Sequence, residues 1–276
     1  MRVPPTVFST SADLARTLAG QIADGIELAA GEDRPYVLGC PGGRSPRGTY
    51  SALADEVRRR TLDLSGLVIA MMDDYVEAGP DGSFVQVADD LPHSCRRFAR
   101  DEIVEPLTRA AGPGRGIAGD HVWFPQPTDP ESYDERLGTV GGIDLFLLAS
   151  GASDGHVAFN PPWSARGSRS RVVRLADSTR RDNLATFPTL RSGSGQSLDR
   201  VPTHGVTVGI DTIARYSRSA VMIVVGGDKA HALTRLAGAT RHEPDWPATV
   251  LSECSQPGLF TDTATAALSV PEPVAS

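Results

Sequence analysis

The stretch PYVLGCPGGRSPRGTY, residues 35–50, decides the fold predicted for this chain. A continuous apolar run at 35–40 leads through two glycines into a segment with helical apolar spacing, which we expect to form a helix over 46–60. The same succession of an apolar strand and an amphipathic helix recurs along the chain. Further strands are predicted at 67–72, 121–124, 143–149, 171–175, 205–210 and 220–226, and further helices at 11–30, 95–107, 130–137, after 211 and from 228.

This alternation predicts an α/β fold. Continuous apolar strands separated by amphipathic helices are typical of a doubly wound, mostly parallel, Rossmann-like sheet with helices on both faces. No linker-like stretch divides residues 1–276, so we expect one domain. Within it, the low-complexity stretch 191–197 is predicted to be a mobile loop and residues from about 269 to 276 a frayed tail.

Composition argues against several classes of protein. The formal net charge of −7 disfavours a nucleic-acid partner, and no apolar run reaches the roughly 20 residues that span a bilayer, so no membrane partner is expected. The N-terminus has no signal-peptide pattern, and the three cysteines lack the spacing of a disulfide framework or a thiolate metal site. We therefore expect a cytoplasmic protein, with a homo-oligomer among the assemblies left open.

Loops that follow strands are the places to search for a site, because parallel sheets bind ligands outside the carboxyl ends of their strands. Gly42 and Gly43, after the first strand, would let backbone N–H groups approach an anion. Arg44 and Ser45 add donors there, and Ser45 is the expected N-cap of the next helix. The pattern favours a phosphate cradle, although a plain tight turn explains the same glycines.

Lys229 is the only lysine among the 27 basic residues, the rest being arginine. A position that keeps lysine in such a chain indicates a need for an ammonium group, with survival by chance as the alternative. Lys229 lies in the first turn of a predicted helix, where a cation is unfavourable unless an anion is bound there too. We therefore predict that Lys229 binds phosphate.

Two adjacent carboxylates, Asp73 and Asp74, end the apolar strand in MMDDYV, residues 71–76. Neighbours on an extended chain point to opposite sides, so only one of the two can face a common cavity. A buried carboxylate at this place is suited to take a proton from a carbon next to a carbonyl. Helix capping or loop solvation is the alternative reading of the pair.

A second acid and an imidazole lie on one turn in GASDGHVAFNPP, residues 151–162. Asp154 and His156 flank a glycine, and a nearby carboxylate can orient a histidine or hold it protonated. A structural histidine is the alternative, but this compact turn lets both side chains serve one substrate. No metal site is predicted, because the other five histidines show no metal-ligand spacing: 93, 121, 204, 231 and 242.

Together, and in this order, these stretches resemble the glucosamine-6-phosphate deaminase/isomerase family, which is related to the 6-phosphogluconolactonases. The similarity runs from about residue 10 to 265. MDDYV at 72–76 is like the family's Met-Asp-Glu-Tyr segment, and DGHVAFNPP at 154–162 is like its Asp-Gly-His-Ile-Ala-Phe-Asn-Glu-Pro. The lactonase branch usually has Asp-Glu-Arg and a shorter loop at these two places, so this chain sides with the deaminases.

The resemblance implies a sugar-phosphate aldose–ketose isomerase that also deaminates an amino sugar such as glucosamine 6-phosphate. It implies that Asp73 moves a proton between C2 and C1 of the open-chain sugar. His156 would be the acid/base of ring opening, with Asp154 as its partner. The implied phosphate ligands are Gly43, Ser45 and Lys229, and the implied partner is a small sugar phosphate, with no metal or organic cofactor.

Two positions depart from the family pattern. The family's glutamate after Phe-Asn is Pro161 here, so one member of the implied ring-opening relay is missing. An expected arginine is Ala185, which removes a phosphate ligand that Arg44, Arg180 or Arg181 would have to replace. Two alternatives therefore stay open: a 6-phosphogluconolactonase-like hydrolase that uses His156, and a non-catalytic sugar-phosphate-binding protein.

Overall fold

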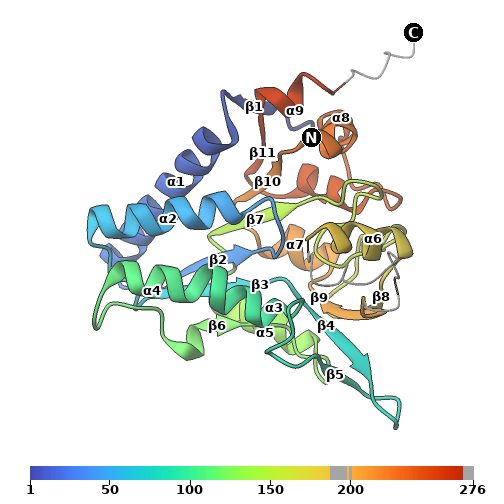
Figure 1. Ribbon diagram of the computed structural model, residues 1–276, viewed down its shortest axis with the longest axis horizontal. Helices are drawn as coiled ribbons and strands as arrows, with labels where there is room; N and C mark the ends of the chain where they lie inside the picture. The colour runs from blue at the N-terminus through green and yellow to red at the C-terminus, as the bar shows by residue number, and fades with distance from the viewer. Residues whose placement is uncertain (187–197, 199–200, 270–276) are drawn as a thin grey trace.

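A sheet of seven parallel strands forms the centre of the computed structural model, which describes residues 1–186, 198 and 201–269 (Figure 1). The strand order is β1-β11-β10-β7-β2-β3-β6, and every pairing is parallel. The predicted doubly wound, mostly parallel α/β fold is confirmed. The strands are β1 Pro5–Phe8, β2 Tyr36–Cys40, β3 Leu67–Met71, β6 Val122–Trp123, β7 Leu145–Ala149, β10 Ala220–Val224 and β11 Pro257–Asp262.

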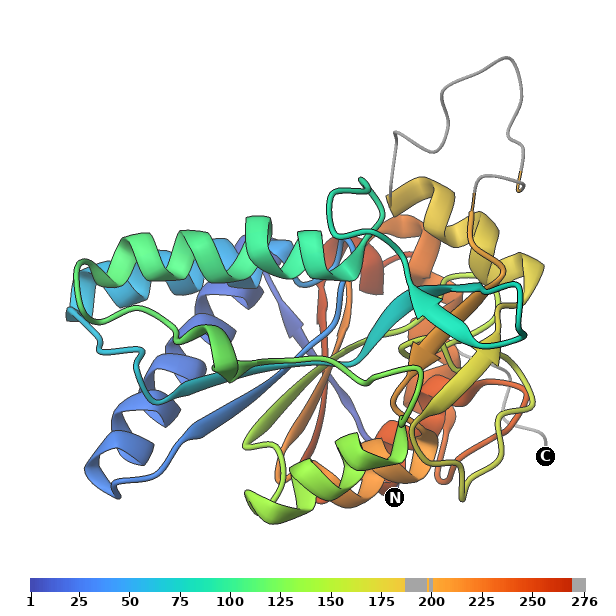
Figure 2. The same ribbon diagram turned by 90° about the horizontal axis from the view of Figure 1, so that it is seen from below.

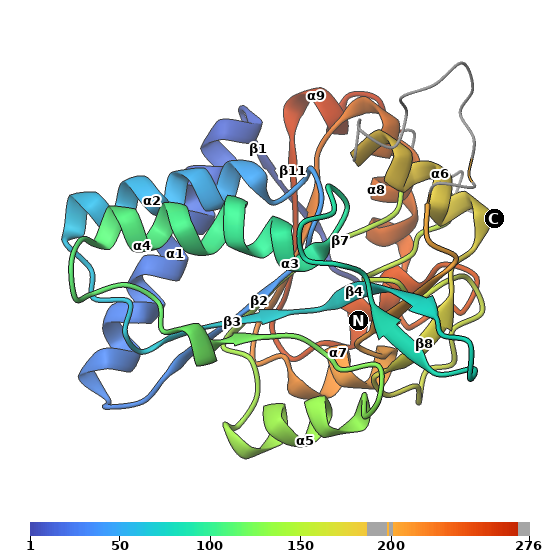
Figure 3. The same ribbon diagram turned by 60° about the horizontal axis from the view of Figure 1, so that its bottom comes forward.

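Helices cover both faces because side chains along each buried strand alternate between the faces. In β7, Leu145 and Leu147 pack with α1, α2 and α4, whereas Phe146 and Leu148 pack with α5, α7 and α8. Figures 2 and 3 show α1, α2 and α4 on one side of the sheet and α5 and α7 on the other. The bounds are α1 Ser11–Gly31, α2 Arg47–Arg60, α4 Glu105–Ala111, α5 Glu131–Thr139, α7 Ile210–Tyr216 and α8 Ala230–Gly238.

A second, antiparallel sheet corrects the sequence prediction in two places. Its order is β5-β4-β9-β8. A further strand, β4, follows directly after the strand predicted at 67–72, and the strands predicted at 171–175 and 205–210 lie in this sheet rather than in the parallel one. Apolar patterns identify strands but not their partners. The bounds are β4 Asp73–Ala78, β5 Phe84–Gln86, β8 Arg171–Arg174 and β9 His204–Thr207.

Smaller differences concern single elements. The helix predicted over 95–107 is interrupted: α3, Cys95–Phe98, continues through a π-helical turn, Ala99–Val104, into α4. The strands β1 and β11, which pair with each other at one side of the sheet, were not predicted, and β11 begins with Pro257 and Gly258, which are unfavourable in strands. The remaining α-helices are α6 Asp177–Thr186 and α9 Thr263–Ala266, and 3₁₀ segments lie at Gly119–His121, Gly227–Lys229 and Pro247–Glu253.

Three further sequence predictions concern the loop at 191–197, the C-terminal tail and the absence of a membrane-spanning segment. The loop predicted at 191–197 and nearly all of the tail predicted at 269–276 fall outside the described residues. Among the residues that are described, no helix combines the length and the apolar composition that crossing a bilayer requires.

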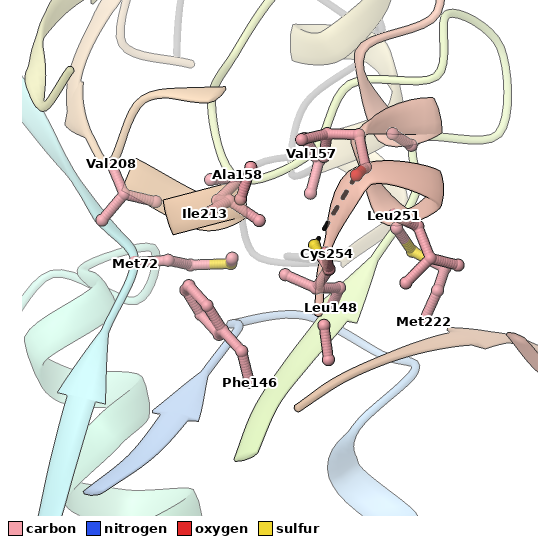
Figure 4. Close-up of a cluster of buried hydrophobic side chains, with 14 of the residues drawn as sticks. Met72, Phe146, Leu148, Val157, Ala158, Val208, Ile213, Met222, Leu251 and Cys254 are labelled. Carbon is pink, nitrogen blue, oxygen red and sulfur yellow. Dashed lines mark hydrogen bonds between the residues drawn. The ribbon is translucent and has the colours of Figure 1, made fainter. Parts of the chain in front are cut away.

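The apolar core reaches directly under the loop that follows β7. Figure 4 shows Met72, Phe146 and Leu148 beside Val157 and Ala158 of that loop. All five side chains belong to one buried cluster, so the chain just beyond His156 is fixed by packing. The core thereby holds the acid–imidazole turn against the sheet.

Candidate active site

The loops singled out from the sequence come together because they follow four adjacent strands. β10, β7, β2 and β3 are neighbours in the sheet, and the chain runs from β2 outward to β3 on one side and from β7 to β10 on the other. Such a switch point is where parallel sheets open a crevice for ligands. A cavity at this edge is lined by seven of the predicted site residues: Gly42, Gly43, Arg44, Ser45, Asp73, His156 and Lys229.

Lys229 joins two of these loops. Its Nζ donates hydrogen bonds to Ser45 Oγ and to the carbonyl oxygen of Ser150, both at 2.9 Å. The residue is only 8% exposed, and this burial lowers the pKa of Lys229 to about 8 because the charged form loses its hydration. An ammonium group has three protons, so these two contacts leave one for a ligand.

In the glycine-rich loop, Gly43 has a backbone conformation that favours glycine, whereas Ser45 does not have the predicted role. Gly43 has φ +95°, which glycine adopts without strain. Helix α2 begins at Arg47 with Pro46 as N-cap and no side-chain cap bond, so the prediction of Ser45 as N-cap was wrong. The Ser45 hydroxyl instead accepts the bond from Lys229.

Of the three arginines named as replacements at position 185, only Arg44 lines the cavity. Arg44 pairs with Asp228 at 2.8 Å, and both side chains are about half exposed. Arg180 donates to the carbonyl oxygens of Leu198 and Val201. Neither Arg180 nor Arg181 belongs to the cavity lining, so the prediction that either takes this role is not supported by their placement.

Asp73 and Asp74 face opposite sides, as predicted. Asp73 is 6% exposed and lines the cavity. Asp74 is fully buried and accepts hydrogen bonds at Oδ1 from the backbone N–H groups of Tyr75, at 2.9 Å, and Cys95, at 3.1 Å. Asp74 therefore links β4 to the start of α3 and does not reach the cavity.

Burial gives Asp73 the basicity that proton transfer at carbon requires. It raises the pKa of Asp73 to about 7, because a carboxylate in apolar surroundings lacks hydration. The Cys95 thiol opposes this rise with a weak hydrogen bond, Sγ to Oδ1 at 3.5 Å. Asp73 is thus a stronger base than an exposed aspartate and is still ionised in appreciable fraction near neutral pH.

Asp154 holds the imidazole of His156 from behind. Its Oδ1 lies 2.6 Å from Nδ1 of His156, and its Oδ2 accepts hydrogen bonds from Ser178 Oγ, at 2.6 Å, and Thr179 Oγ1, at 2.7 Å. Burial alone would raise the pKa of Asp154, but these bonds outweigh it and hold that pKa well below its usual range. The ionised carboxylate places a proton on Nδ1 and leaves Nε2 available for a ligand.

The loop under the imidazole requires a glycine. A Cβ on Gly151 would lie 2.2 Å from His156 Nδ1 and 2.6 Å from Asp154 Oδ1, closer than any side-chain carbon is tolerated. The backbone therefore passes directly against the Asp154–His156 pair. This close approach fixes the distance between the pair and the end of β7.

Several cavity residues were not predicted from the sequence. Cys95 reaches the cavity from α3, Ser150 contributes a carbonyl oxygen, and Asp182 and Asn183 line it from α6. Neither helix directly follows a strand of the parallel sheet, so the rule used to choose loops could not identify them. The nearest sequence signal was the departure from the family pattern at Ala185, three residues after Asp182.

Three of the side chains offer donor atoms that a divalent cation could use. Atoms of Asp154, His156 and Asp182 all lie within 4.8 Å of one another. Both oxygens of Asp154 already accept hydrogen bonds, and Asp182 Oδ2 accepts from backbone N–H groups of Ala152 and Ser153. These contacts make the group a hydrogen-bonded cluster in which Asp154 has no free oxygen for a metal.

Pro161 does not line the site cavity. It borders a separate, shallow cavity together with Trp163, Ser164 and Arg171. A ring-opening role for position 161 therefore has no support from the direction of this side chain.

The fold and the candidate site define a Rossmann-like α/β protein with a cavity at the switch point of the parallel sheet. No family model matches the chain. It is 33% identical over 225 residues to a glucosamine-6-phosphate deaminase of Streptomyces avermitilis, which covers 79% of this chain and 76% of that protein. It is 30% identical over 266 residues to a glucosamine-6-phosphate isomerase of Candida albicans, with 95% and 97% covered. The chain belongs to the glucosamine-6-phosphate deaminase/isomerase family.

Solved structures agree with this assignment. A monomeric glucosamine-6-phosphate deaminase superposes with a TM-score of 0.79 at 26% identity, over 96% of this chain and 99% of that one. A 6-phosphogluconolactonase from Trypanosoma cruzi superposes with a TM-score of 0.67 at 18% identity, over 97% of each chain. The second likeness shows a shared fold.

Proposed function

We propose that this protein deaminates and isomerises glucosamine 6-phosphate to fructose 6-phosphate and ammonia. The observation that carries the proposal is that Asp73, His156 and Lys229, from three separate segments of the chain, face one cavity. A base near neutral pH, an oriented imidazole and a buried ammonium are the groups that an aldose–ketose isomerisation of a phosphorylated sugar requires.

Each group has one task in the proposed reaction. Asp73 takes the proton from C2 of the open-chain amino sugar and returns it to C1. O1 gains a proton as the C1=O bond becomes C1–OH, and the amine loses one as the C2=N bond forms, which leaves an imine at C2. Water hydrolyses that imine and releases ammonia. His156, held by Asp154, exchanges protons with the sugar during ring opening.

The phosphate is assigned to the part of the cavity formed by the loops after β2 and β10. Lys229, Ser45, Gly42, Gly43 and Arg44 supply a buried cation, a hydroxyl, backbone N–H groups and a half-exposed guanidinium. A desolvated ammonium interacts far more strongly with a phosphate than an exposed one does. Burial lowers the pKa of Lys229, and a bound phosphate would raise that pKa again because it favours the charged ammonium group.

The domain organisation, the partner and the cellular compartment are part of the same proposal. We take residues 1–276 as one catalytic domain whose partner is the small sugar phosphate, without nucleic acid. The three cysteines are free and buried, which fits a reducing cytoplasm.

The test is ammonia release from glucosamine 6-phosphate, measured with a coupled dehydrogenase. Acid release from 6-phosphogluconolactone, followed in the same preparation, tests the hydrolase alternative. Calorimetric binding of glucosamine 6-phosphate without either product would indicate a binding protein. Asp73 favours the first outcome, because lactone hydrolysis by His156 has no use for a second buried base that faces the same cavity.

A further inference from the structure

Asp182 is a cavity-lining carboxylate to which the proposed reaction assigns no task. It lies on α6, one helical turn after Ser178 and Thr179, the residues that anchor Asp154. It lines the same cavity as His156. Helix α6 thus supports one carboxylate of the site and supplies another.

The carboxylate of Asp182 is held in a fixed position. Its Oδ2 accepts hydrogen bonds from the backbone N–H groups of Ala152, at 3.1 Å, and Ser153, at 3.3 Å, and from Ser153 Oγ, at 3.1 Å. No hydrogen bond to its Oδ1 is found within residues 1–186, 198 and 201–269. One oxygen is therefore fixed by the loop that carries the Asp154–His156 pair, and the other is available to a ligand.

The distance to His156 suits a shared substrate atom. An oxygen of Asp182 and a ring nitrogen of His156 lie no more than 4.8 Å apart. Two hydrogen bonds of about 2.8 Å that meet at one hydroxyl oxygen span roughly 4.6 Å, so the two side chains are close enough to contact the same sugar or neighbouring oxygens of it. Both side chains can thus reach adjacent oxygens of a single bound sugar.

Opening a sugar ring requires a base and an acid at adjacent oxygens. The anomeric hydroxyl loses its proton as the C1=O double bond forms, the C1–O5 bond breaks with its electron pair on O5, and O5 takes up a proton. One histidine serves both oxygens only if it moves between them, whereas two positioned groups serve them together.

We propose that Asp182 is a second catalytic residue of ring opening, which accepts the anomeric proton while His156, carrying a proton on each ring nitrogen, donates the one on Nε2 to O5. The proton on Asp182 then passes to Nε2 of His156, a neighbour within 4.8 Å, so both groups return to their starting states. This inference rests on the proposed function.

The test compares a cyclic substrate with one that cannot form a ring. The variant Asp182→Asn keeps the side-chain shape and an oxygen for the Ala152 and Ser153 N–H groups but removes the base. Ammonia release from glucosamine 6-phosphate reports ring opening and the later steps. Deuterium uptake from D2O at C1 of 5-deoxyfructose 6-phosphate in the presence of ammonia reports imine formation and proton transfer at carbon without ring opening, because this ketose lacks the hydroxyl that closes the ring.

Asp182→Asn should lower kcat/KM for glucosamine 6-phosphate by the ~10²–10⁴-fold typical of one positioned acid or base, while deuterium uptake stays near the wild-type rate. Asp177→Asn is the matched control, because Asp177 lies on the same helix with its side chain 64% exposed. Ser153→Ala removes one of the loop contacts and leaves the carboxylate, so it should affect both reactions only slightly.

Two results would overturn the inference. An equal loss of rate in both reactions would show that Asp182 only anchors the loop, and an unchanged rate in both would show that it takes no part in the reaction. Circular dichroism shows whether Asp182→Asn folds. If it does not, Asp182→Ser takes its place, and the same selective loss of activity on glucosamine 6-phosphate is expected. A wild-type protein inactive on both substrates would instead refute the proposed function, and with it the reaction step assigned to Asp182.

Discussion

Lys229 Nζ and Ser45 Oγ lie 2.9 Å apart although 184 positions separate the two residues in the sequence. The contact exists because β2 and β10 are separated in the sheet by β7 alone, so the loops after them end at the same edge. It turns two unremarkable loops into one polar site with a buried positive charge.

Lys229→Ala should weaken binding of phosphorylated sugars by the ~2–5 kcal/mol expected when a charged partner of a desolvated anion is removed. Calorimetric titration with glucosamine 6-phosphate and with glucosamine measures the difference. Arg44→Ala is the matched comparison, and its half-exposed pairing with Asp228 predicts a loss of only ~0–1 kcal/mol. Equal losses for glucosamine and its phosphate in Lys229→Ala would make the lysine purely structural.

Asp73→Asn should abolish deuterium exchange at C2 while leaving substrate affinity close to that of the wild type, because the amide keeps the shape and loses the base. Asp74→Asn should retain the exchange, since Asp74 does not reach the cavity. It should instead lower the melting temperature, because Asp74 anchors the backbone N–H groups of Tyr75 and Cys95. If Asp74→Asn, and not Asp73→Asn, stops the exchange, the two roles must be reversed.

The pH dependence of kcat/KM should show an acidic limb near pH 7. Asp73 must be ionised to act as a base, and its pKa is raised to about 7, so activity falls as pH drops below that value. Cys95→Ser replaces a weak thiol donor by a stronger hydroxyl donor at the same carboxylate, which favours the ionised form and moves this limb to lower pH. An acidic limb that stays in place in Cys95→Ser would contradict the contact.

A basic limb near pH 8 is expected from Lys229. Burial lowers the pKa of its ammonium group to about 8, so the free protein loses this positive charge as pH rises above that value. Binding of inorganic phosphate, titrated between pH 7 and 9, should weaken over this interval. Lys229→Arg keeps its charge throughout, so any binding that remains should show no such decline.

Asp73→Asn should also stabilise the protein more at pH 8 than at pH 5. Between the usual aspartate pKa and about 7, the folded state holds a proton at Asp73 that the unfolded state has released, so the wild type loses stability as pH rises through this window. At about 1.4 kcal/mol per pKa unit, the gain should be larger at pH 8 by roughly 1–3 kcal/mol. Urea unfolding at both pH values measures it, and an identical gain at both would show that Asp73 does not titrate in this range.

Local sequence patterns were enough to predict the parallel sheet and most residues of the candidate site. Apolar strands such as 35–40 and 143–149 can be buried only between two helical layers, so their composition identifies the fold class. The site residues Asp73, His156 and Lys229 each follow such a strand directly. Once the strands are known to be parallel and adjacent, these side chains must meet at one edge.

Only the tertiary structure decided which side chains complete the cavity and how strongly each is perturbed. Asp182 and Cys95 lie on helices whose placement depends on packing, and the placement of α3 depends additionally on the hydrogen bond that the Cys95 N–H donates to Asp74. The raised pKa of Asp73 and the lowered pKa of Lys229 both arise from burial, which no local pattern records. Local sequence sets which groups are present, whereas their desolvation depends on chain segments up to 184 positions away, as between Ser45 and Lys229.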